Sequence, residues 1–569
     1  MSAMTSRVPL FILIATLWPL SAEPQEGRRR PGSKRQVESV EEKAQEPVRE
    51  SETILNRWDM LYQGKWYDPY NQNILKGDLP IFGSQESPWF LELGITSDSF
   101  FEYRKSPVPV SIFGAVTQRP DSQGFFGDPD QFVYAQSFAF LLSLYQGNTS
   151  FKPPNFDFRI QPVFNFNYAR LGEYGLLRAN PMSGNSRSDY HLGFQELSAE
   201  FHLIDLSERY DFLAMRLGIQ PFNADFRGFV YFSAEPGARL FGNYADNKWQ
   251  YNLAFFRRLD KETNSGLNSL FDDRQENVIV ANLYRQDFPV LGHTLQGVGI
   301  YRFDLSSEGP DVYDKNGFLV RPTSIGDQRR KDVHTAYLGV NGDGHFGRWN
   351  VSESFYFVMG KETHNPIAGR EVRICAWMAA LEISYDIDWF RVKGSAFWAS
   401  GDRDPNDDKG TGFDGIVDQP NFAGGEFSYW QRQGLPFIAG GVTNLNNRLS
   451  LLPNLRPGKE QGQNNFVNPG VQIFHLGIDI EILPQLKMLN NYSFIRLDDS
   501  AVIEQLRQDG SISQNLGYDL STGFLYRPFL NNNVQFKLGG ALFIPEDGFA
   551  NLFGSELYFQ TFTNLIFTY

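Results

Sequence analysis

Apolar and polar residues alternate along the end of the chain, from Leu516 to Tyr569. From Leu516 to Tyr526 every second residue is Leu, Tyr, Thr or Phe, and the residues between them, up to Gly523, are Gly, Asp or Ser. The alternation returns near 532–544 and near 555–569. A period of two over about ten residues is typical of a strand with one apolar and one polar face. The C-terminal stretch therefore predicts three amphipathic strands, the last of which ends on an aromatic residue.

The same pattern recurs from Trp89 onward and predicts an all-β protein of about eighteen strands. We expect these strands near 89–103, 131–147, 155–170, 191–204, 210–220, 236–244, 248–258, 277–287, 293–304, 333–340, 348–360, 374–387, 390–401, 469–483, 486–497, 514–527, 532–544 and 555–569.

Short and long connections alternate between these strands. The short ones lie near 151–154, 205–209, 246–247, 287–292, 341–347, 387–388, 484–485 and 528–533. The long ones lie near 104–130, 171–190, 221–235, 259–276, 305–332, 361–373, 402–468, 498–513 and 545–554. This alternation predicts an antiparallel up-and-down transmembrane β-barrel, with short turns in the periplasm and long loops outside the cell. A soluble β-sandwich is the alternative, but it does not require the alternation.

Charged residues keep to one face of the predicted strands. In 156–168 the Phe, Ile and Tyr residues share one face with each other, and Asp157, Arg159, Gln161, Asn165 and Asn167 share the other. Leu197 to Leu203 and Phe474 to Ile482 alternate in the same way. Because Arg or Lys on the lipid face costs about 2–4 kcal/mol at the bilayer midplane, the polar face must point inward. We therefore expect a wet interior, wide enough for an aqueous channel.

The inward set supplies candidate lumen or substrate-binding residues. Fixed basic groups in a narrow pore concentrate anions and set selectivity. The candidates are Arg159, Arg216, Arg239, Arg391, Lys393 and Lys537. The alternative is that these groups only pair with inward acids such as Asp157, Glu196, Glu200, Asp479 and Glu481 and brace the wall.

The N-terminus and the composition indicate where in the cell the protein is located. Residues 1–22 are typical of a secretory signal peptide, because one basic residue precedes the apolar run Val8–Leu20 and then Ser21-Ala22. We expect a disordered charged periplasmic leader at 23–56, an ordered lead-in or periplasmic plug segment at 57–88, and an outer-membrane barrel at 89–569 with a long loop at 402–468. A formal net charge of -14 argues against nucleic-acid binding, and the single cysteine, Cys375, which we expect to be buried, excludes a disulfide framework.

Oxygen ligands crowd the beginning of the longest loop. They are Asp402, Asp404, Asn406, Asp407, Asp408 and Asp414, spaced by Gly and Pro. Such a set suits Ca²⁺, which takes six to eight oxygens in flexible geometry. The alternative is an acidic solvated turn, in which Asp and Asn side chains form tight bends.

The same loop carries a family resemblance. Ser400-Gly401-Asp402-Arg403-Asp404-Pro405-Asn406-Asp407, followed by Phe413-Asp414, resembles a segment of alginate-export-type outer-membrane porins. Met215-Arg216-Leu217-Gly218-Ile219-Gln220 is similar to a strand of that family, with Ile219 in place of its basic residue. The resemblance implies an eighteen-stranded barrel with an electropositive constriction that passes an anionic polymer, and Arg216 as a lumen residue. The departure at Ile219 puts an alginate-like substrate in doubt.

These observations predict a bacterial outer-membrane channel that passes polar or anionic solutes, such as an anionic polysaccharide. Its expected partners are outer-membrane lipid and lipopolysaccharide, the solute, and the barrel-assembly machinery, which would recognise Tyr569. Two alternatives are a barrel that sheathes a partner's electron conduit and a surface receptor or adhesin. We find neither HExxH nor GxSxG, and the seven His residues are scattered, so the sequence does not predict an enzyme.

Overall fold

The computed structural model describes residues 73–84, 87–108, 128–147, 149, 153–209, 211–435, 437, 449–453 and 455–569. The predicted signal peptide, the predicted leader and residues 57–72 of the lead-in lie outside these residues. No helix among the described residues is long and apolar enough to cross a membrane.

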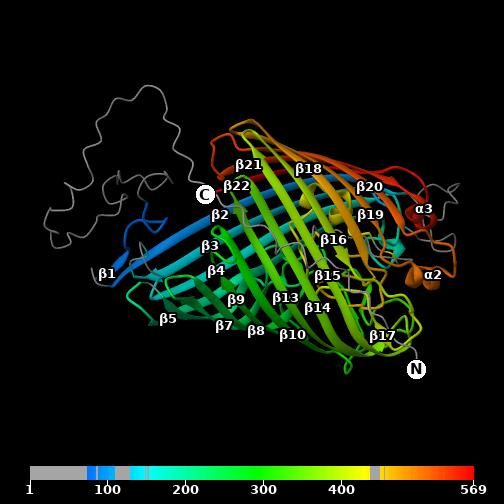
Figure 1. Ribbon diagram of the computed structural model, residues 1–569, viewed down its shortest axis with the longest axis horizontal. Helices are drawn as coiled ribbons and strands as arrows, with labels where there is room; N and C mark the ends of the chain where they lie inside the picture. Colours follow the sequence, from blue (N-terminus) through cyan, green and yellow to red (C-terminus); the bar gives the residue numbers. More distant parts are fainter. Residues whose placement is uncertain are drawn as a thin grey trace. The chain divides into compact units, whose positions relative to one another are not determined.

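Eighteen antiparallel strands form one closed barrel, as the sequence predicted (Figure 1). They are β2 (Ser87–Lys105), β3 (Asp130–Gln146), β4 (Phe156–Leu171), β5 (Ser186–Asp205), β6 (Phe212–Asn223), β7 (Phe232–Tyr244), β8 (Trp249–Lys261), β9 (Asn268–Arg285), β10 (His293–Leu305), β13 (Asp332–Phe346), β14 (Trp349–Asn365), β15 (Arg370–Ile387), β16 (Phe390–Ala399), β18 (Val471–Leu483), β19 (Leu486–Arg496), β20 (Asn515–Tyr526), β21 (Val534–Pro545) and β22 (Tyr558–Thr568). Each strand pairs with the next along the chain, and β2 pairs with β22 to close the ring.

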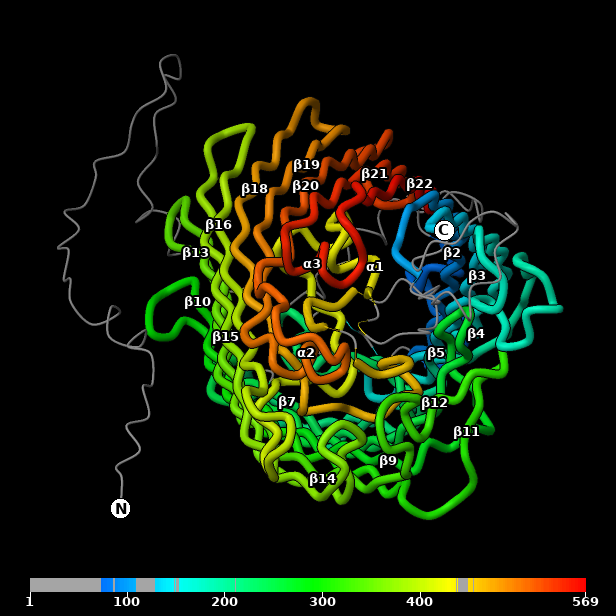
Figure 2. Tube along the Cα trace, turned by 90° about the vertical axis from the view of Figure 1, so that its right-hand side faces the viewer, coloured from blue at the N-terminus to red at the C-terminus, as the bar shows by residue number. Residues whose placement is uncertain are grey.

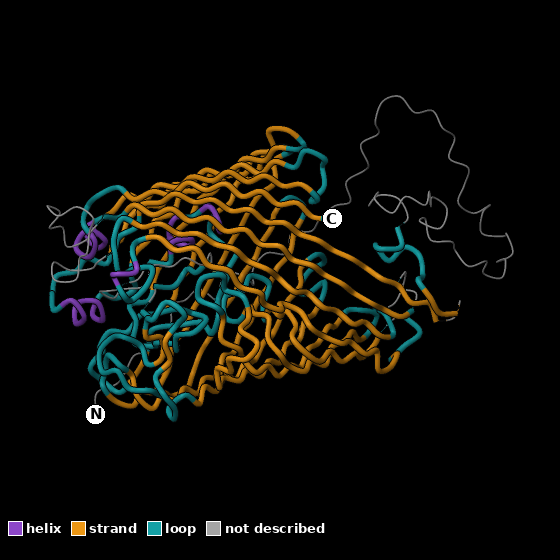
Figure 3. Tube along the Cα trace, turned by 180° about the vertical axis from the view of Figure 1, so that it is seen from behind, coloured by secondary structure: helices purple, strands orange, loops and turns teal. Residues whose placement is uncertain are grey.

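Shorter elements decorate the barrel. β1 (Phe82–Ser84) pairs antiparallel with the beginning of β2, and β17 (Lys409–Gly410) pairs in parallel with β15. β11 (Val312–Tyr313) pairs with β12 (Leu319–Arg321). The helices are η2 (Pro181–Ser183), η3 (Gly425–Phe427), α1 (Tyr429–Gln433), α2 (Ala501–Arg507) and α3 (Asp547–Phe553). Figure 3 shows α2 and α3 at one end of the barrel, together with long loops, and the C-terminus at the other.

The outward face of the barrel is apolar. Exposed large side chains such as Leu142, Phe164, Leu253, Ile478 and Leu538 come from strands all around it. The predicted faces of β4, β5 and β18 are confirmed over the middle of each strand, where polar residues such as Asn165, Glu200 and Asp479 are buried and alternate residues such as Phe164, Phe201 and Ile478 are exposed; Glu481, at the end of β18, is exposed. This surface is that of a barrel that spans a membrane.

Cys375 departs from expectation. It is exposed rather than buried. It lies on β15 opposite Met359, an exposed residue of β14.

Two predicted loops are instead continuations of strands. β14 and β15 run on to Asn365 and Arg370, so the predicted loop at 361–373 is a tight turn, and β9 begins at Asn268, well before the expected 277. Strand ends that project beyond the bilayer have polar residues on both faces, so alternation no longer identifies them.

Glu353 breaks the alternation of β14 because it points outward. There its Oε1 lies 2.9 Å from Nε2 of the buried His293 on β10.

The barrel seam is closed at the short-turn end by both ends of the described chain. The backbone N–H of Tyr569 donates to the carbonyl of Ile95 at 2.8 Å. The side-chain amide of Asn73 donates to the hydroxyl of Tyr569 at 3.0 Å, and the ammonium of Lys76 lies 4.0 Å from the centre of the Tyr569 ring. Residues 73–84 therefore lie against the seam at the mouth of the barrel.

Candidate functional site

The connection between β16 and β18 runs through the inside of the barrel. We name the described residues of this connection, 400–435, 437, 449–453 and 455–470, the lumen loop; it contains β17, η3 and α1. Figure 2 shows α1 and neighbouring segments, in yellow, within the ring of strands. The shorter β6–β7 connection also turns inward, and Tyr231 there forms a parallel bridge with Val417 of the lumen loop.

An apolar core joins the lumen loop to one side of the barrel. Phe229 of the β6–β7 connection lies 5.5 Å from Phe422 of the loop and 5.9 Å from Phe397 of β16, between ring centroids. The inward faces of the neighbouring strands supply the other apolar side chains, including Val278, Val298, Val333, Tyr356, Val372, Ile374 and Met378. The prediction of a wet interior is therefore wrong for this side, because alternate inward positions of these strands are also apolar and pack on the loop.

Charged side chains hold the returning limb of the lumen loop, residues 455–470, through its backbone carbonyls. Arg274 donates to the carbonyls of Glu460 and Gly462 at 2.9 and 2.8 Å. The other donors are Arg258 to Glu460, Arg321 to Gln461 at 2.7 Å and Lys331 to Asn464 at 2.9 Å. These bonds come from β8, β9, β12 and the end of the β10–β13 connection, so the limb is fixed along several elements.

Arg258 and Arg274, two of the cations that hold this limb, belong to a buried network around Glu276. The carboxylate of Glu276 accepts from Arg258 at 2.8 Å and from Arg302 at 2.6 Å, and all three side chains are completely buried. These pairs fix the buried guanidinium groups in place. Detaching the returning limb would remove its backbone carbonyls from Arg258 and Arg274, and a hydrogen bond to a charged group contributes about 1.5–3 kcal/mol.

The outgoing limb of the lumen loop, residues 400–435, is bound through α1 to the opposite side of the barrel, at β20 and β2. The carboxylate of Asp519 on β20 accepts from the Ser428 hydroxyl at 2.6 Å and from the Trp430 backbone N–H at 3.0 Å. On β2, the buried carboxylate of Glu102 accepts from Arg432 Nε at 3.0 Å and from the Gln433 side-chain amide at 2.6 Å. The hydroxyl of Ser428 also accepts from the Gln431 N–H, which caps the helix.

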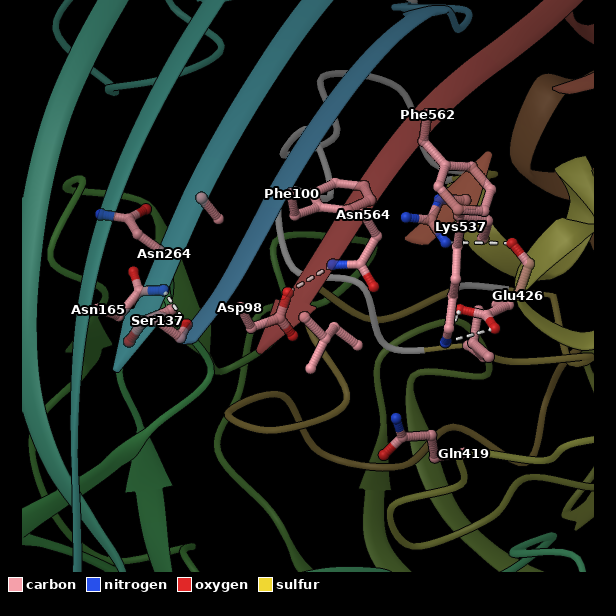
Figure 4. A pocket seen from close by; sticks show the side chains of 15 residues that line it. Asp98, Phe100, Ser137, Asn165, Asn264, Gln419, Glu426, Lys537, Phe562 and Asn564 are labelled. Atoms are coloured by element: carbon pink, nitrogen blue, oxygen red, sulfur yellow. Dashed lines mark hydrogen bonds and ion pairs between the residues drawn. The ribbon is translucent and has the colours of Figure 1, made fainter. Parts of the chain in front are cut away.

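A polar space of about 330 Å³ remains between this limb and the wall formed by β2, β3, β4, β21 and β22. Its described lining includes Asp98, Phe100, Ser137, Asn165, Asn264, Gln419, Glu426, Arg432, Lys537, Phe562 and Asn564 (Figure 4). The ammonium of Lys537 bridges both oxygens of Glu426 at 2.8 and 3.1 Å. The carboxylate of Asp98 accepts a hydrogen bond from the side-chain amide of Asn564. We call this space the lumen passage.

Three of the predicted basic residues stand side by side on β4 to β7. In the strand register Asp157 faces Glu200, Glu200 faces Arg216, and Arg216 faces Arg239. Arg159 Nε lies 2.7 Å from Asp157, and Arg216 Nε lies 2.8 Å from Glu200. Arg239 instead donates to the side-chain carbonyl of Asn252 at 2.7 Å, and its guanidinium lies 4.4 Å from the centre of the Phe241 ring.

The other three basic residues are elsewhere. On β16, Arg391 donates to Asp386 at 3.1 Å and Lys393 Nζ lies 2.8 Å from Asp479. Lys537 is the one member of the predicted set on the lining of the lumen passage. The six residues therefore do not form one ring, and five of them have a carboxylate partner, as the bracing alternative proposed.

The predicted calcium ligands lie at the beginning of the lumen loop, and none of them belongs to a strand. Asp402 accepts from the N–H groups of Asp404 and Thr411 at 3.0 and 3.1 Å, and Asp407 accepts from that of Lys409 at 2.7 Å. Asp408 pairs with Arg373 at 2.6 Å. Within the described residues no group of three His, Cys, Asp or Glu side chains is placed to hold a metal ion. Calcium binding stays a prediction, and these bonds are those of the turn alternative.

Asp402 is a titratable group of this turn. Burial raises its pKa to about 6, and the charges of Asp407 and Asp404 act in the same direction.

The sequence pointed to Lys537 but missed the other charged groups of the lumen passage. Asp98 occupies an inward position of β2, and strand parity alone could have identified it. Glu426 and Arg432 lie in the lumen loop, where no periodicity indicates which side chains meet a wall formed far away in the sequence.

No protein-family model matches the chain, and no curated protein is similar to it in sequence. Among solved structures it is similar to OccK7 (OpdD) of Pseudomonas aeruginosa, at 13% identity and a TM-score of 0.45, over 84% of this chain and 98% of that one. It is also similar to OccAB3 of Acinetobacter baumannii, at 12% identity and a TM-score of 0.45, over 84% and 99%. A third is a BenF-like porin from Pseudomonas fluorescens Pf-5, at 11% identity and a TM-score of 0.43, over 84% and 98%.

The chain's own strand pairing and surface determine its location. Bacterial outer-membrane barrels have an even number of antiparallel strands, short turns on one side and an apolar outer band. The chain has all three features. It is a β-barrel of the bacterial outer membrane.

Proposed function

We propose that this protein is a porin-like channel that passes small polar solutes across the outer membrane. The observation that carries the proposal is the lumen passage, a polar space of about 330 Å³ beside the lumen loop. Amide, hydroxyl and charged side chains line it, and such groups replace the hydration of a small polar solute. The fixed returning limb narrows the lumen, so solute size is limited by the loop and not by the strand number.

An anionic polysaccharide is the second candidate, which the resemblance to alginate-export-type porins implies. The row of Arg159, Arg216 and Arg239 favours it, because Arg239 has no carboxylate partner in this row. A polymer, however, needs a continuous wide path, whereas the lumen loop is tied to Asp519 and Glu102 on one side and to Arg274 on the other. We therefore favour small solutes.

The electron-conduit alternative has no observation in its favour, since a partner would need the room that the lumen loop occupies. A receptor or adhesin role of the long outer loops stays an alternative that the channel experiment also addresses. We propose further that the assembly machinery recognises the final strand with Tyr569, whose backbone then closes the seam with Ile95.

Single-channel conductance of the purified, refolded protein in a planar bilayer tests the proposal. We expect stable conductance steps, and larger steps from Asp519→Ala, which releases Ser428 and Trp430 and loosens α1. Exposed Glu481→Gln at the short-turn end of β18 is the matched control and leaves the steps unchanged. A folded barrel, identified by its heat-dependent mobility in gel electrophoresis, that conducts no ions would refute the channel.

A further inference from the structure

We propose that Asp98 and Glu426 make the lumen passage selective for cations and for small solutes with an ammonium or guanidinium group. This inference rests on the proposed channel function. It is the opposite of the anion preference that the basic residues of the sequence predict. It follows from which charged groups reach the open space and which are already neutralised.

Arg432 contributes little charge to the lumen passage. Its guanidinium lies 3.9 Å from the centre of the Phe562 ring and 4.6 Å from that of Phe100. Its Nε donates to Glu102, and its side chain is only 4% exposed. A guanidinium that is enclosed by two rings and paired with a buried carboxylate holds α1 in place and does not face a passing solute.

Three charged side chains of the described lining therefore remain, and two are acidic. The Lys537 side chain is 20% exposed and that of Glu426 is 36% exposed, and the two neutralise each other. Asp98 accepts its hydrogen bond from a neutral amide, that of Asn564, and forms no ion pair with another described residue. The described lining therefore has a net charge of about −1, located at Asp98 on β2, with Glu426 on the lumen loop (Figure 4).

A net negative charge in so narrow a space is enough to select ions. At ~5 Å in water a unit charge enriches a monovalent cation about fourfold, and a lower local dielectric constant strengthens the effect. Rings of Asp and Glu act in this way in cation channels. The amides of Asn165, Asn264, Asn564 and Gln419 and the hydroxyl of Ser137 can bind the neutral polar part of the same solute.

The basic row on β4 to β7 does not cancel this charge. Arg159 and Arg216 are paired with Asp157 and Glu200, and neither belongs to the described lining of the lumen passage. Arg239 is also absent from the described lining of the lumen passage, so a solute in that space meets Asp98 and not the basic row.

The experiment measures the reversal potential of single channels under a gradient of KCl and then with ethylammonium chloride in place of KCl. We expect the wild type to prefer K⁺ over Cl⁻ at least about fourfold. Asp98→Asn removes the unpaired charge, and Glu426→Gln leaves Lys537 to balance Asp98, so each single variant should be close to non-selective. The double variant leaves Lys537 alone and should prefer Cl⁻. Ethylammonium permeability should fall in parallel.

Glu481→Gln is the control, because it makes the same charge change at an exposed position outside the lining and should leave the ratio unchanged. A wild-type channel that prefers Cl⁻, or a double variant that keeps the wild-type ratio, would overturn the inference while the channel function stands. A folded barrel without conductance would overturn the channel function itself. Heat-dependent gel mobility of every variant establishes that the barrel has formed.

Discussion

Glu102 is the group on which the position of α1 depends most directly. It lies on β2 with a completely buried side chain and accepts from Arg432, from Gln433 and, at 3.4 Å, from Arg104. Glu102→Gln keeps the shape but removes the charge and turns one acceptor oxygen into a donor. Two buried guanidinium groups then share one acceptor, in a place that water does not reach.

The free-energy cost of Glu102→Gln follows from the buried guanidinium charge that loses its carboxylate partner. Removing one member of a buried ion pair typically costs about 3–5 kcal/mol, most of it the penalty of the uncompensated partner. The variant can avoid this cost only by releasing α1 from β2, so the loss of stability cannot exceed the free energy that docks the outgoing limb. We expect either a loss of about 3–5 kcal/mol in unfolding or, if docking is weaker, a detached α1 with larger and less stable conductance steps.

Denaturant unfolding in detergent and hydrogen exchange of the backbone amides of 425–435 measure these two results. The double variant Glu102→Gln with Arg432→Gln removes both charges and should recover part of the loss, because no charged Arg432 remains to be compensated. Glu481→Gln, whose partner Lys487 lies 3.6 Å away at the exposed rim, should cost at most about 1 kcal/mol. A Glu102→Gln variant with unchanged stability, exchange and conductance would refute this account of the tether.

Two further predictions concern the turn at Asp402 and the seam. The pKa of Asp402 is about 6, above its ordinary value of 3.8, so its contribution to stability is fully present below pH 3.8 and is lost as the pH rises through 6. The melting temperature should therefore fall over this range, and less so in Asp402→Asn; parallel curves would contradict this. At the seam, Asn73→Ala with Lys76→Ala should lower stability by about 1–3 kcal/mol, through one hydrogen bond and one cation–π contact with Tyr569. Exposed Ile74→Ala is the control in thermal unfolding, and an equal loss there would contradict the seam contacts.

The barrel could be predicted from the sequence because lipid imposes a strict rule on one face of each strand. Ile478 and Leu538 must be apolar where they meet acyl chains, and this requirement repeats with a period of two through every membrane-spanning strand. Beyond the bilayer, every second residue no longer has to be apolar. For that reason β9, β14 and β15 extend further than the alternation indicates, and the polar residues at 361–373 had the composition of a loop.

The inside of the barrel obeys no such rule, and this explains why the candidate site could be predicted only in part. An inward residue meets water, another wall residue or the lumen loop, and each of these partners accepts a different residue type. Val278 and Val333 face the lumen as apolar residues because the loop covers them, whereas Asp98 faces it as an acid because the loop leaves space there. The basic residues were found because parity places them inside, but their charge was overestimated because pairing depends on neighbours such as Glu200 and Asp479, whose contacts only the closed barrel determines.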